Sequence, residues 1–233
     1  MRILAIESSA VTASVAILED DTLVAEYTIS HMITHSHALL PMIDEIFSMV
    51  QLKPDDVDVI AVSKGPGSFT GLRIGAATGK GIALALDKKM VAVPTLAAMA
   101  YNLYGDSRYI CPVMDARRKH LYSGIYTFDG DRLITVRDVN LESYDELAEE
   151  LAGLDGQVVL VGDGVDVAGD VLKEQLGDKC VLAPAHIKTQ RAGSVALLAK
   201  QMADNGEYTD ADELKPDYLR PSQAEREKAQ HES

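Results

Sequence analysis

The chain has 233 residues, of which 47% are apolar and 5% aromatic, with no tryptophan. This is enough apolar material for one or two domains with buried cores. Its formal net charge is −14, and phosphate backbones are bound mainly through Lys and Arg, so the composition argues against a general nucleic-acid binder or a protein held at an anionic membrane surface.

The first half of the chain alternates short apolar runs with helical periodicity, which predicts strands and helices in a regular order. The expected strands are Ile3–Ile6, Ser14–Leu18, Leu23–Ile29, Val57–Val62 and Met90–Val93. The expected helices are residues 37–50, Leu72–Leu86 and Thr95–Tyr104. Taken in chain order, these elements read βββαβαβα.

The second half repeats that order. The expected strands are Tyr109–Met114, His120–Phe128, Leu133–Val139, Val158–Val161 and Cys180–Ala183. The expected helices are Tyr144–Leu151, Val165–Leu176 and Ser194–Asn205. A duplicated βββαβαβα unit is typical of the actin-like superfamily of sugar kinases and chaperone ATPases, an α/β fold with two lobes. We expect a first lobe at residues 1–106, a second at 107–221 and a charged tail at 222–233.

Cys111 and Cys180 fit no CxxC pattern and are expected to be reduced, buried thiols. No signal peptide is expected, because only a short apolar run separates Arg2 from Glu7. No run approaches the ~18 apolar residues that a membrane helix needs. We therefore expect a cytoplasmic protein.

The fold resemblance implies a cleft between the lobes. In that superfamily, an acidic residue ending the first strand of each half organises a metal ion, and here those positions are Glu7 and Asp115. We expect them on opposite walls of one cleft; the alternative is that they are ordinary carboxylates at strand ends. The positions that we assign to the cleft, with possible nucleotide contact, are Glu7, Ser8, Ser9, Gly65, Gly67, Ser68 and Asp115.

Residues 65–75 read GPGSFTGLRIG and follow a predicted strand. Their spacing, GxGxxxG, misses the dinucleotide fingerprint by one residue, and the run from Gly75 to Lys80 misses a Walker loop by one. In the following helix Gly75, Gly79 and Ala83 recur every four residues. Glycine inside a helix costs about 1 kcal/mol relative to alanine, so we expect close packing there to offset the cost.

These residues resemble the TsaB family throughout the glycine-rich run. Further similarity lies in ILAIESS at residues 3–9, where Asp-Thr-Ser is usual, and in Thr34-His35-Ser36 before Leu39-Leu40-Pro41. Asp115-Ala116-Arg117 and Tyr218-Leu219-Arg220 also match. The resemblance covers nearly the whole chain.

The resemblance implies a subunit without catalytic residues. In the related catalytic subunit, TsaD, two metal-binding histidines follow the corresponding segment, and here Thr95 and Met99 stand in their places. A hydroxyl and a thioether cannot replace paired imidazoles. His31 and His35 have HxxxH spacing, but no glutamate lies between them. We therefore expect no metal site and no cofactor, and surface or interface roles for these histidines.

The resemblance also implies the partners. The chain would form a heterodimer with TsaD, a homodimer in isolation, and a larger complex that the ATPase TsaE joins. TsaC would supply threonylcarbamoyl-adenylate. The complex would modify the tRNA adenosine next to the anticodon, and this chain would contact tRNA only indirectly. The interface residues that we predict on the first long helix are Leu39, Met42, Ile43, Ile46 and Met49, with burial in the chain's own core as the alternative for the methionines.

An enzyme remains the competing class. A weak ATP-binding enzyme or small-molecule kinase would use Glu7, Asp115 and Gly162-Asp163-Gly164 in the cleft, but no Lys or Arg lies near Ser8-Ser9 to hold phosphates. A peptidase is disfavoured, because the sequence shows no zinc-ligand set and no Ser/His/Asp arrangement.

Overall fold

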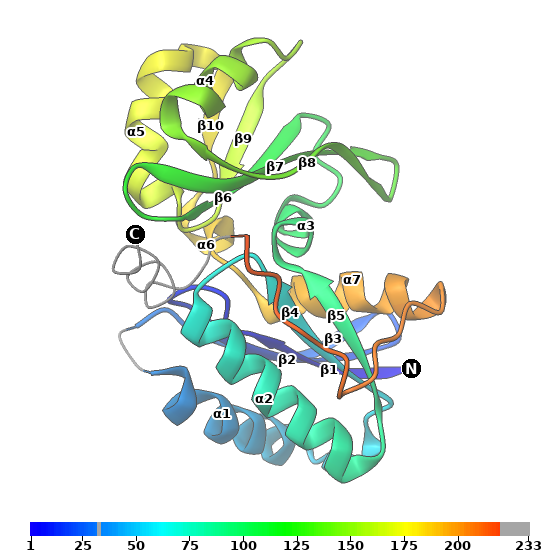
Figure 1. Cartoon of the computed structure of the whole chain (residues 1–233). Coiled ribbons are helices and arrows are strands. Elements are labelled where there is room, and N and C mark those ends of the chain that lie inside the picture. The colour runs from blue at the N-terminus through cyan, green and yellow to red at the C-terminus, as the bar shows by residue number, and fades with distance from the viewer. Residues whose placement is uncertain (32–33, 220–233) are drawn as a thin grey trace, which may run out of the picture.

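In the computed structural model, the described residues, 1–31 and 34–219, form two five-stranded sheets, each with helices packed against it (Figure 1). The first sheet has the order β3-β2-β1-β4-β5. β1 pairs antiparallel with β2 and parallel with β4. The strands are β1 (Arg2–Glu7), β2 (Ala13–Glu19), β3 (Thr22–Ile29), β4 (Val59–Gly65) and β5 (Lys89–Pro94).

The second sheet repeats this topology, with the order β10-β9-β6-β7-β8. Its strands are β6 (Tyr109–Asp115), β7 (His120–Asp129), β8 (Arg132–Ser143), β9 (Val158–Val161) and β10 (Cys180–Leu182). In each sheet the first strand is central, with an antiparallel meander on one side and parallel strands on the other. The predicted duplication and fold class are confirmed.

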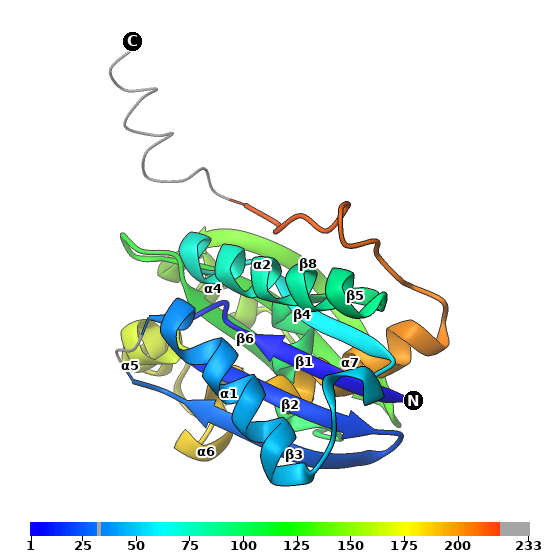
Figure 2. The same ribbon diagram turned by 90° about the horizontal axis from the view of Figure 1, so that it is seen from below.

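Two helices, α1 (His35–Val50) and α2 (Phe69–Leu86), cover one face of the first sheet (Figures 1 and 2). Their apolar stripes pack on alternate residues of the strands, such as Leu4, Ile6 and Val62, in one buried cluster. Ser68 caps α2, because its Oγ accepts a hydrogen bond from Gly71 N at 3.3 Å. Each of the two helices therefore turns its apolar side toward the sheet, as expected of an amphipathic helix at the surface of a domain.

The opposite face of the first sheet is covered by α7 (Ala192–Asp204), which packs Val195, Ala196 and Ala199 against Ile3 and Val91. This helix lies in the range expected for the second lobe, 107–221. The reverse holds for α3 (Thr95–Ala100), whose Leu96, Met99 and Ala100 pack against the second sheet. The lobes therefore exchange helices, and packing does not follow the sequence boundaries, because each sheet needs cover on both faces.

The second sheet is covered on its other face by α4 (Tyr144–Ala152) and α5 (Val165–Leu176). Ser143 and Glu146 form a capping box at the start of α4. Cys111 and Cys180 are free and buried in this core, as predicted. The remaining short helices are α6 (Ala185–Lys188) and the 3₁₀ turns Pro54–Asp56, Tyr101–Leu103 and Gly177–Lys179.

After α7, residues 206–219 return across the first lobe beside α2 (Figure 2). Thr209 N donates to Met90 O at 2.9 Å, and Leu214 is buried in the core under α1 and α2. Met32, Ile33, Arg220, Pro221 and the predicted tail at 222–233 lie outside the described residues. Within those residues, no helix combines the length and apolar character required to span a membrane.

Candidate functional site

The glycine-rich segment lies directly on the loop that follows β1. A Cβ atom on Gly67 would be 2.4 Å from Ser9 O, and one on Gly71 would be 2.1 Å from Ser8 O. Hydrogen bonds join the same parts, from Ser68 N to Ser9 O (2.6 Å) and from Ser8 Oγ to Gly71 O (2.9 Å). The glycines therefore allow a close backbone approach. In α2, a Cβ atom on Gly75 would be 2.2 Å from Ser8 Oγ, so the predicted close packing of this helix is confirmed.

Glu7 is buried at the end of β1, and its carboxylate accepts hydrogen bonds from neighbouring groups. Ser9 donates to Oε1 through its backbone N (2.6 Å) and its Oγ (2.5 Å), and Ser63 Oγ donates to Oε2. Burial raises the pKa of this carboxyl, although the three donors act in the other direction. In this structure Glu7 ties β1 to β4 and to its own loop.

The other end of the glycine-rich segment is closed by the C-terminal residues. Gly65 has a φ of +118° and forms a cis peptide with Pro66. A Cβ atom on it would be 2.8 Å from Asp217 O. Asp217 N donates to Lys64 O at 2.7 Å, and their side chains form an ion pair at 3.2 Å. The strand end at Gly65 is thus held between helix α2 and the returning chain.

Asp115 ends β6 in the second lobe and has its own partners. Its Oδ1 accepts from Arg117 N at 2.7 Å, and its Oδ2 pairs with the Arg117 guanidinium at 2.9 Å. Asp163 lies next to it: Asp163 Oδ2 is 3.5 Å from Asp115 N, and Asp163 Oδ1 accepts from Gln190 Nε2 at 2.6 Å. Burial raises the pKa of Asp163.

The residues assigned to the cleft therefore do not form one group. Glu7, Ser8, Ser9, Gly67 and Ser68 come together, and the first three are buried. Gly65 lies at the end of β4, against Asp217 and Leu72. Asp115 holds a turn in the other lobe. Nucleotide contact at these positions stays a prediction.

The five interface residues predicted on α1 divide unequally. Leu39, Met42, Ile43 and Ile46 are at most 6% exposed and belong to the core of the first lobe, whereas Met49 is 67% exposed. The prediction is therefore corrected for four of the five. They form the i, i+3, i+4, i+7 stripe that faces the sheet, so they cannot also face a partner.

The outer side of α1 and α2 carries other apolar residues. Leu84 is 63% exposed on α2, and Leu40 is 58% exposed on the flank of α1 opposite Met49, since nine residues separate the two on the helix. Ala77, Gly81 and Ala85 are also exposed, at four-residue spacing on α2. A Cβ atom on Gly81 would meet nothing within 4 Å, so no close contact with the described residues calls for a glycine there. In the sequence, these positions could have been recognised as apolar and small residues that lie outside the core-facing stripe of each helix.

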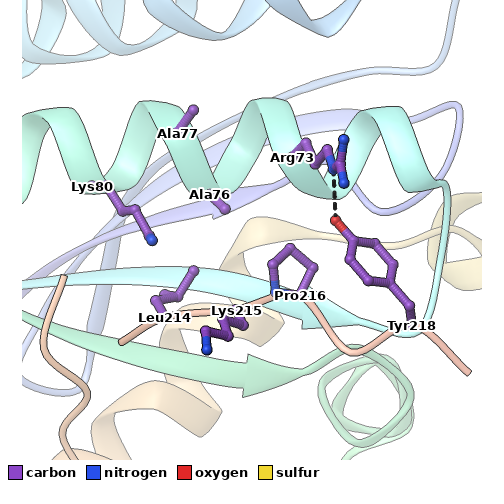
Figure 3. Close-up of a pocket in the computed structure, with 8 residues that line it drawn as sticks. All are labelled: Arg73, Ala76, Ala77, Lys80, Leu214, Lys215, Pro216 and Tyr218. Atoms are coloured by element: carbon purple, nitrogen blue, oxygen red, sulfur yellow. Dashed lines mark hydrogen bonds between the residues drawn. The ribbon is translucent and has the colours of Figure 1, made fainter. Parts of the chain in front are cut away.

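On the flank of α2 beside the C-terminal segment lies a groove of about 460 Å³ (Figure 3). The Arg73 side chain lies 3.9 Å from the centre of the Phe69 ring and donates from Nε to Tyr218 Oη at 3.0 Å. The Phe69 and Tyr218 rings are 4.7 Å apart. The residues that line the groove are Arg73, Ala76, Ala77, Lys80, Leu214, Lys215, Pro216 and Tyr218. Its cations were not singled out in the sequence, because they come from two distant segments.

Possible metal ligands are dispersed in the part of the chain that the structure describes, where no three His, Cys, Asp or Glu side chains gather around a common point. His35 is the first residue of α1, and its Nε2 donates to Ala10 O at 2.7 Å. His31 is exposed before the helix. Thr95 and Met99 are buried on α3, and Thr95 Oγ1 accepts from Gly65 N at 3.1 Å.

Comparison with known families identifies relatives over most of the chain. The family model described as TsaD, tRNA N6-adenosine threonylcarbamoyltransferase, matches residues 22–228. A tRNA threonylcarbamoyladenosine biosynthesis protein TsaB from Bacillus subtilis is 32% identical over 228 residues, 97% of this chain and 96% of the relative. The protein of the same name from Escherichia coli is 32% identical over 227 residues, 94% of this chain and 95% of the relative.

Solved structures agree with this relationship. YeaZ from Pseudomonas aeruginosa superposes with a TM-score of 0.81 at 26% identity, covering 94% of this chain and 99% of that protein. Component A of (R)-2-hydroxyglutaryl-CoA dehydratase from Acidaminococcus fermentans superposes with a TM-score of 0.52 at 14% identity, covering 87% of this chain and 99% of that one. At that identity the second likeness concerns the fold alone.

Proposed function

Because the chain belongs to the TsaB family of tRNA threonylcarbamoyladenosine biosynthesis proteins, we propose that it is the accessory subunit that binds and activates TsaD. TsaD transfers the threonylcarbamoyl group to the tRNA adenosine next to the anticodon. In this proposal the chain supplies no nucleophile, base or metal ligand to that transfer. It shapes and stabilises its partner, and TsaE joins the pair.

The observation that carries the binding role is the outer side of α1 and α2. Two large apolar side chains near the C-terminal ends of these helices, Met49 and Leu84, are more than half exposed. Exposed apolar residues that gather on one side of a molecule often mark a protein interface. Gly81 lies one helical turn before Leu84. Glycine destabilises a helix by about 1 kcal/mol relative to alanine, and within the described residues Gly81 makes no close contact that would offset this cost. A partner helix packed closely over Gly81 would provide that contact.

The proposed partner-binding surface thus consists of Met49, Ala77, Gly81 and Leu84. Of the residues predicted from the sequence, only Met49 stays in it. In isolation the same surface would pair two copies of this chain. Homodimer and heterodimer would then compete for one surface, and mixing with TsaD would replace the first by the second.

The role without catalysis is supported by how the polar residues of the first lobe are used. Glu7 accepts hydrogen bonds from Ser9 and Ser63, and Ser8 donates to Gly71 O. The backbone of the glycine-rich segment fills the space beside Ser8 and Ser9. A phosphate-binding loop needs backbone N–H groups that are open to the ligand. No observation favours the kinase alternative over the accessory role.

The test is size-exclusion chromatography with light scattering, with the chain alone and mixed with the TsaD of its own organism. The wild type should form a stoichiometric heterodimer, and tRNA modification should require both proteins. Met49→Glu and Leu84→Glu should abolish the complex, because each places a charge in an apolar interface.

Matched controls are Val167→Glu and Val171→Glu, which change two exposed valines of α5 on the second lobe. Both controls should bind TsaD as the wild type does. Normal complex formation by Met49→Glu and Leu84→Glu would show that the surface is misplaced. A TsaD that is active alone, with no complex formed, would refute the accessory role.

A further inference from the structure

The turn between β6 and β7 has an unusual backbone. Three consecutive residues, Arg117, Arg118 and Lys119, have φ values of +65°, +56° and +59°. His120 N donates to Arg117 O at 3.2 Å and closes a four-residue turn. Arg118 and Lys119 are its central residues, and positive φ at both defines a type I′ turn. That turn strongly prefers Asn-Gly, because side chains with a Cβ are strained in the left-handed region.

The surrounding contacts explain the position of Arg117 but not the identity of the next two residues. Asp115 binds both the backbone N and the guanidinium of Arg117. His120 Nδ1 donates to the carbonyl oxygen of Arg118 at 2.9 Å, a contact that any residue could provide. All three residues are exposed, and no ion pair of Arg118 or Lys119 is seen with the described residues. Strain that persists without a structural benefit is characteristic of functional sites.

The charge of this turn differs from that of the rest of the molecule. The chain has 36 acidic against 22 basic residues. Several of its cations, such as Arg108, Arg137 and Arg191, are paired with carboxylates. The turn instead presents adjacent cations to solvent at the tip of a hairpin. The two cations of the turn, unpaired within the described residues, therefore attract a polyanion that approaches this otherwise acidic protein.

The shape and composition of the tip indicate the kind of anion. No large apolar side chain is exposed between Gly105 and Asp131, whereas the buried centre of a protein interface needs apolar or aromatic anchors. A hairpin tip is convex, so it does not enclose a free nucleotide or phosphate ion. Two neighbouring cations on a projecting turn suit successive phosphates of a nucleic-acid backbone, which stay hydrated when bound.

We propose that Arg118 and Lys119 bind the phosphodiester backbone of the tRNA substrate. The inference rests on the proposed function, which supplies the RNA. It replaces the expectation that this chain contacts tRNA only indirectly. Such contacts position the RNA without reading its sequence, so the turn would orient the tRNA on the complex while the partner recognises the nucleotide to be modified.

The decisive variant is Arg118→Asn/Lys119→Gly, which installs the sequence that the turn prefers. The complex of chain and TsaD is titrated with an unmodified tRNA transcript at several salt concentrations. The variant should bind tRNA roughly tenfold more weakly at low salt, and the slope of log affinity against log salt should fall by roughly 1.5. Its melting temperature should be at least that of the wild type, because the strain is relieved.

The matched control is Lys53→Gln/Arg132→Gln, which removes two exposed cations elsewhere on the chain. It should bind tRNA as the wild type does. Arg118→Lys, which keeps the charge, should also retain the affinity and the salt slope.

Unchanged tRNA affinity in Arg118→Asn/Lys119→Gly would overturn the inference, and so would an equal loss in the control, which would reflect net charge alone. A variant that lost affinity for TsaD instead would show that the turn binds protein. If the wild type did not bind TsaD, the proposed function would fail. The inference would then depend on whether the isolated chain binds tRNA and loses that binding in the variant.

Discussion

Gly79 of α2 lies directly against Val62 of β4, so that a Cβ atom on the glycine would be 2.4 Å from Val62 Cγ2. Two residues further along the same helix, a Cβ atom on Gly81 would meet nothing within 4 Å. The first glycine is required by packing inside the chain. The second is free of that requirement, which is why we assign it to the surface that binds the partner.

Substitution by alanine should therefore change the free energy of unfolding in opposite directions at the two glycines. Gly79→Ala should lower the free energy of unfolding by roughly 1–3 kcal/mol, because Val62 is buried and must shift. Gly81→Ala should raise it by roughly 0.5–1 kcal/mol, because the helix interior gains a better helix former. Urea denaturation of the two variants measures both effects. A loss of stability in Gly81→Ala would mean that its surroundings are misdescribed.

The two methionines of α1 give a second matched pair. Met42→Ala should lower the free energy of unfolding by roughly 2–5 kcal/mol, because Met42 is 5% exposed in the core and its loss leaves a cavity. Met49→Ala should change it by less than about 0.5 kcal/mol, because Met49 is mostly exposed. Thermal unfolding of the isolated chain separates them. Similar effects in the two variants would contradict the orientation of α1.

Glu7 should give stability a measurable pH dependence. Burial raises its pKa in the folded chain, so folding favours the protonated carboxyl. Its contribution to the free energy of unfolding is fully present below the usual glutamate value of 4.5 and is lost as the pH rises through the higher pKa of the folded chain. The stability of the wild type minus that of Glu7→Gln should therefore decrease as the pH rises from acidic to alkaline. A difference that grew with pH would show that the carboxylate is the favoured form.

The C-terminal segment should contribute to the stability of the first lobe. Leu214 is 2% exposed in the core beneath α1 and α2, so Leu214→Ala should lower the free energy of unfolding by roughly 2–5 kcal/mol. Leu219 is about half exposed, and Leu219→Ala should have almost no effect. Denaturant unfolding with a probe in each lobe would locate the loss. Equal stability of the two variants would show that the segment is only loosely attached.

Much of the fold could be predicted from the sequence, because apolar periodicity depends on local geometry. The strands of both halves and the main helices lie within a few residues of their expected positions. The largest differences are the predicted helix at 95–104, since α3 ends at Ala100 and continues as a 3₁₀ turn, and the predicted strand at 133–139, since β8 continues to Ser143. The exchange of α3 and α7 between the lobes could not be predicted, because an apolar stripe does not specify which sheet it will cover.

The candidate site was predicted less well, for a related reason. The stripe of Leu39, Met42, Ile43 and Ile46 is apolar because it faces the sheet, and the same pattern in the sequence could also describe a stripe that faces a partner. Asp115 was assigned to a cleft because it ends a strand, and its use in holding Arg117 depends on a left-handed turn. Nothing in Arg118-Lys119 predicts that backbone, since the turn favours Asn-Gly.

The position of α7 has a consequence for the order in which the molecule is completed during synthesis. One face of the first sheet is covered mainly by residues 192–203, and Leu214 enters its other core later still. The ribosome therefore makes the whole second sheet before the first lobe can bury both of its faces. Although domains generally fold from the N-terminus as they emerge, here the lobe that begins first is finished last. Chains that terminate early would expose the apolar face formed by Ile3, Ala5 and Val91.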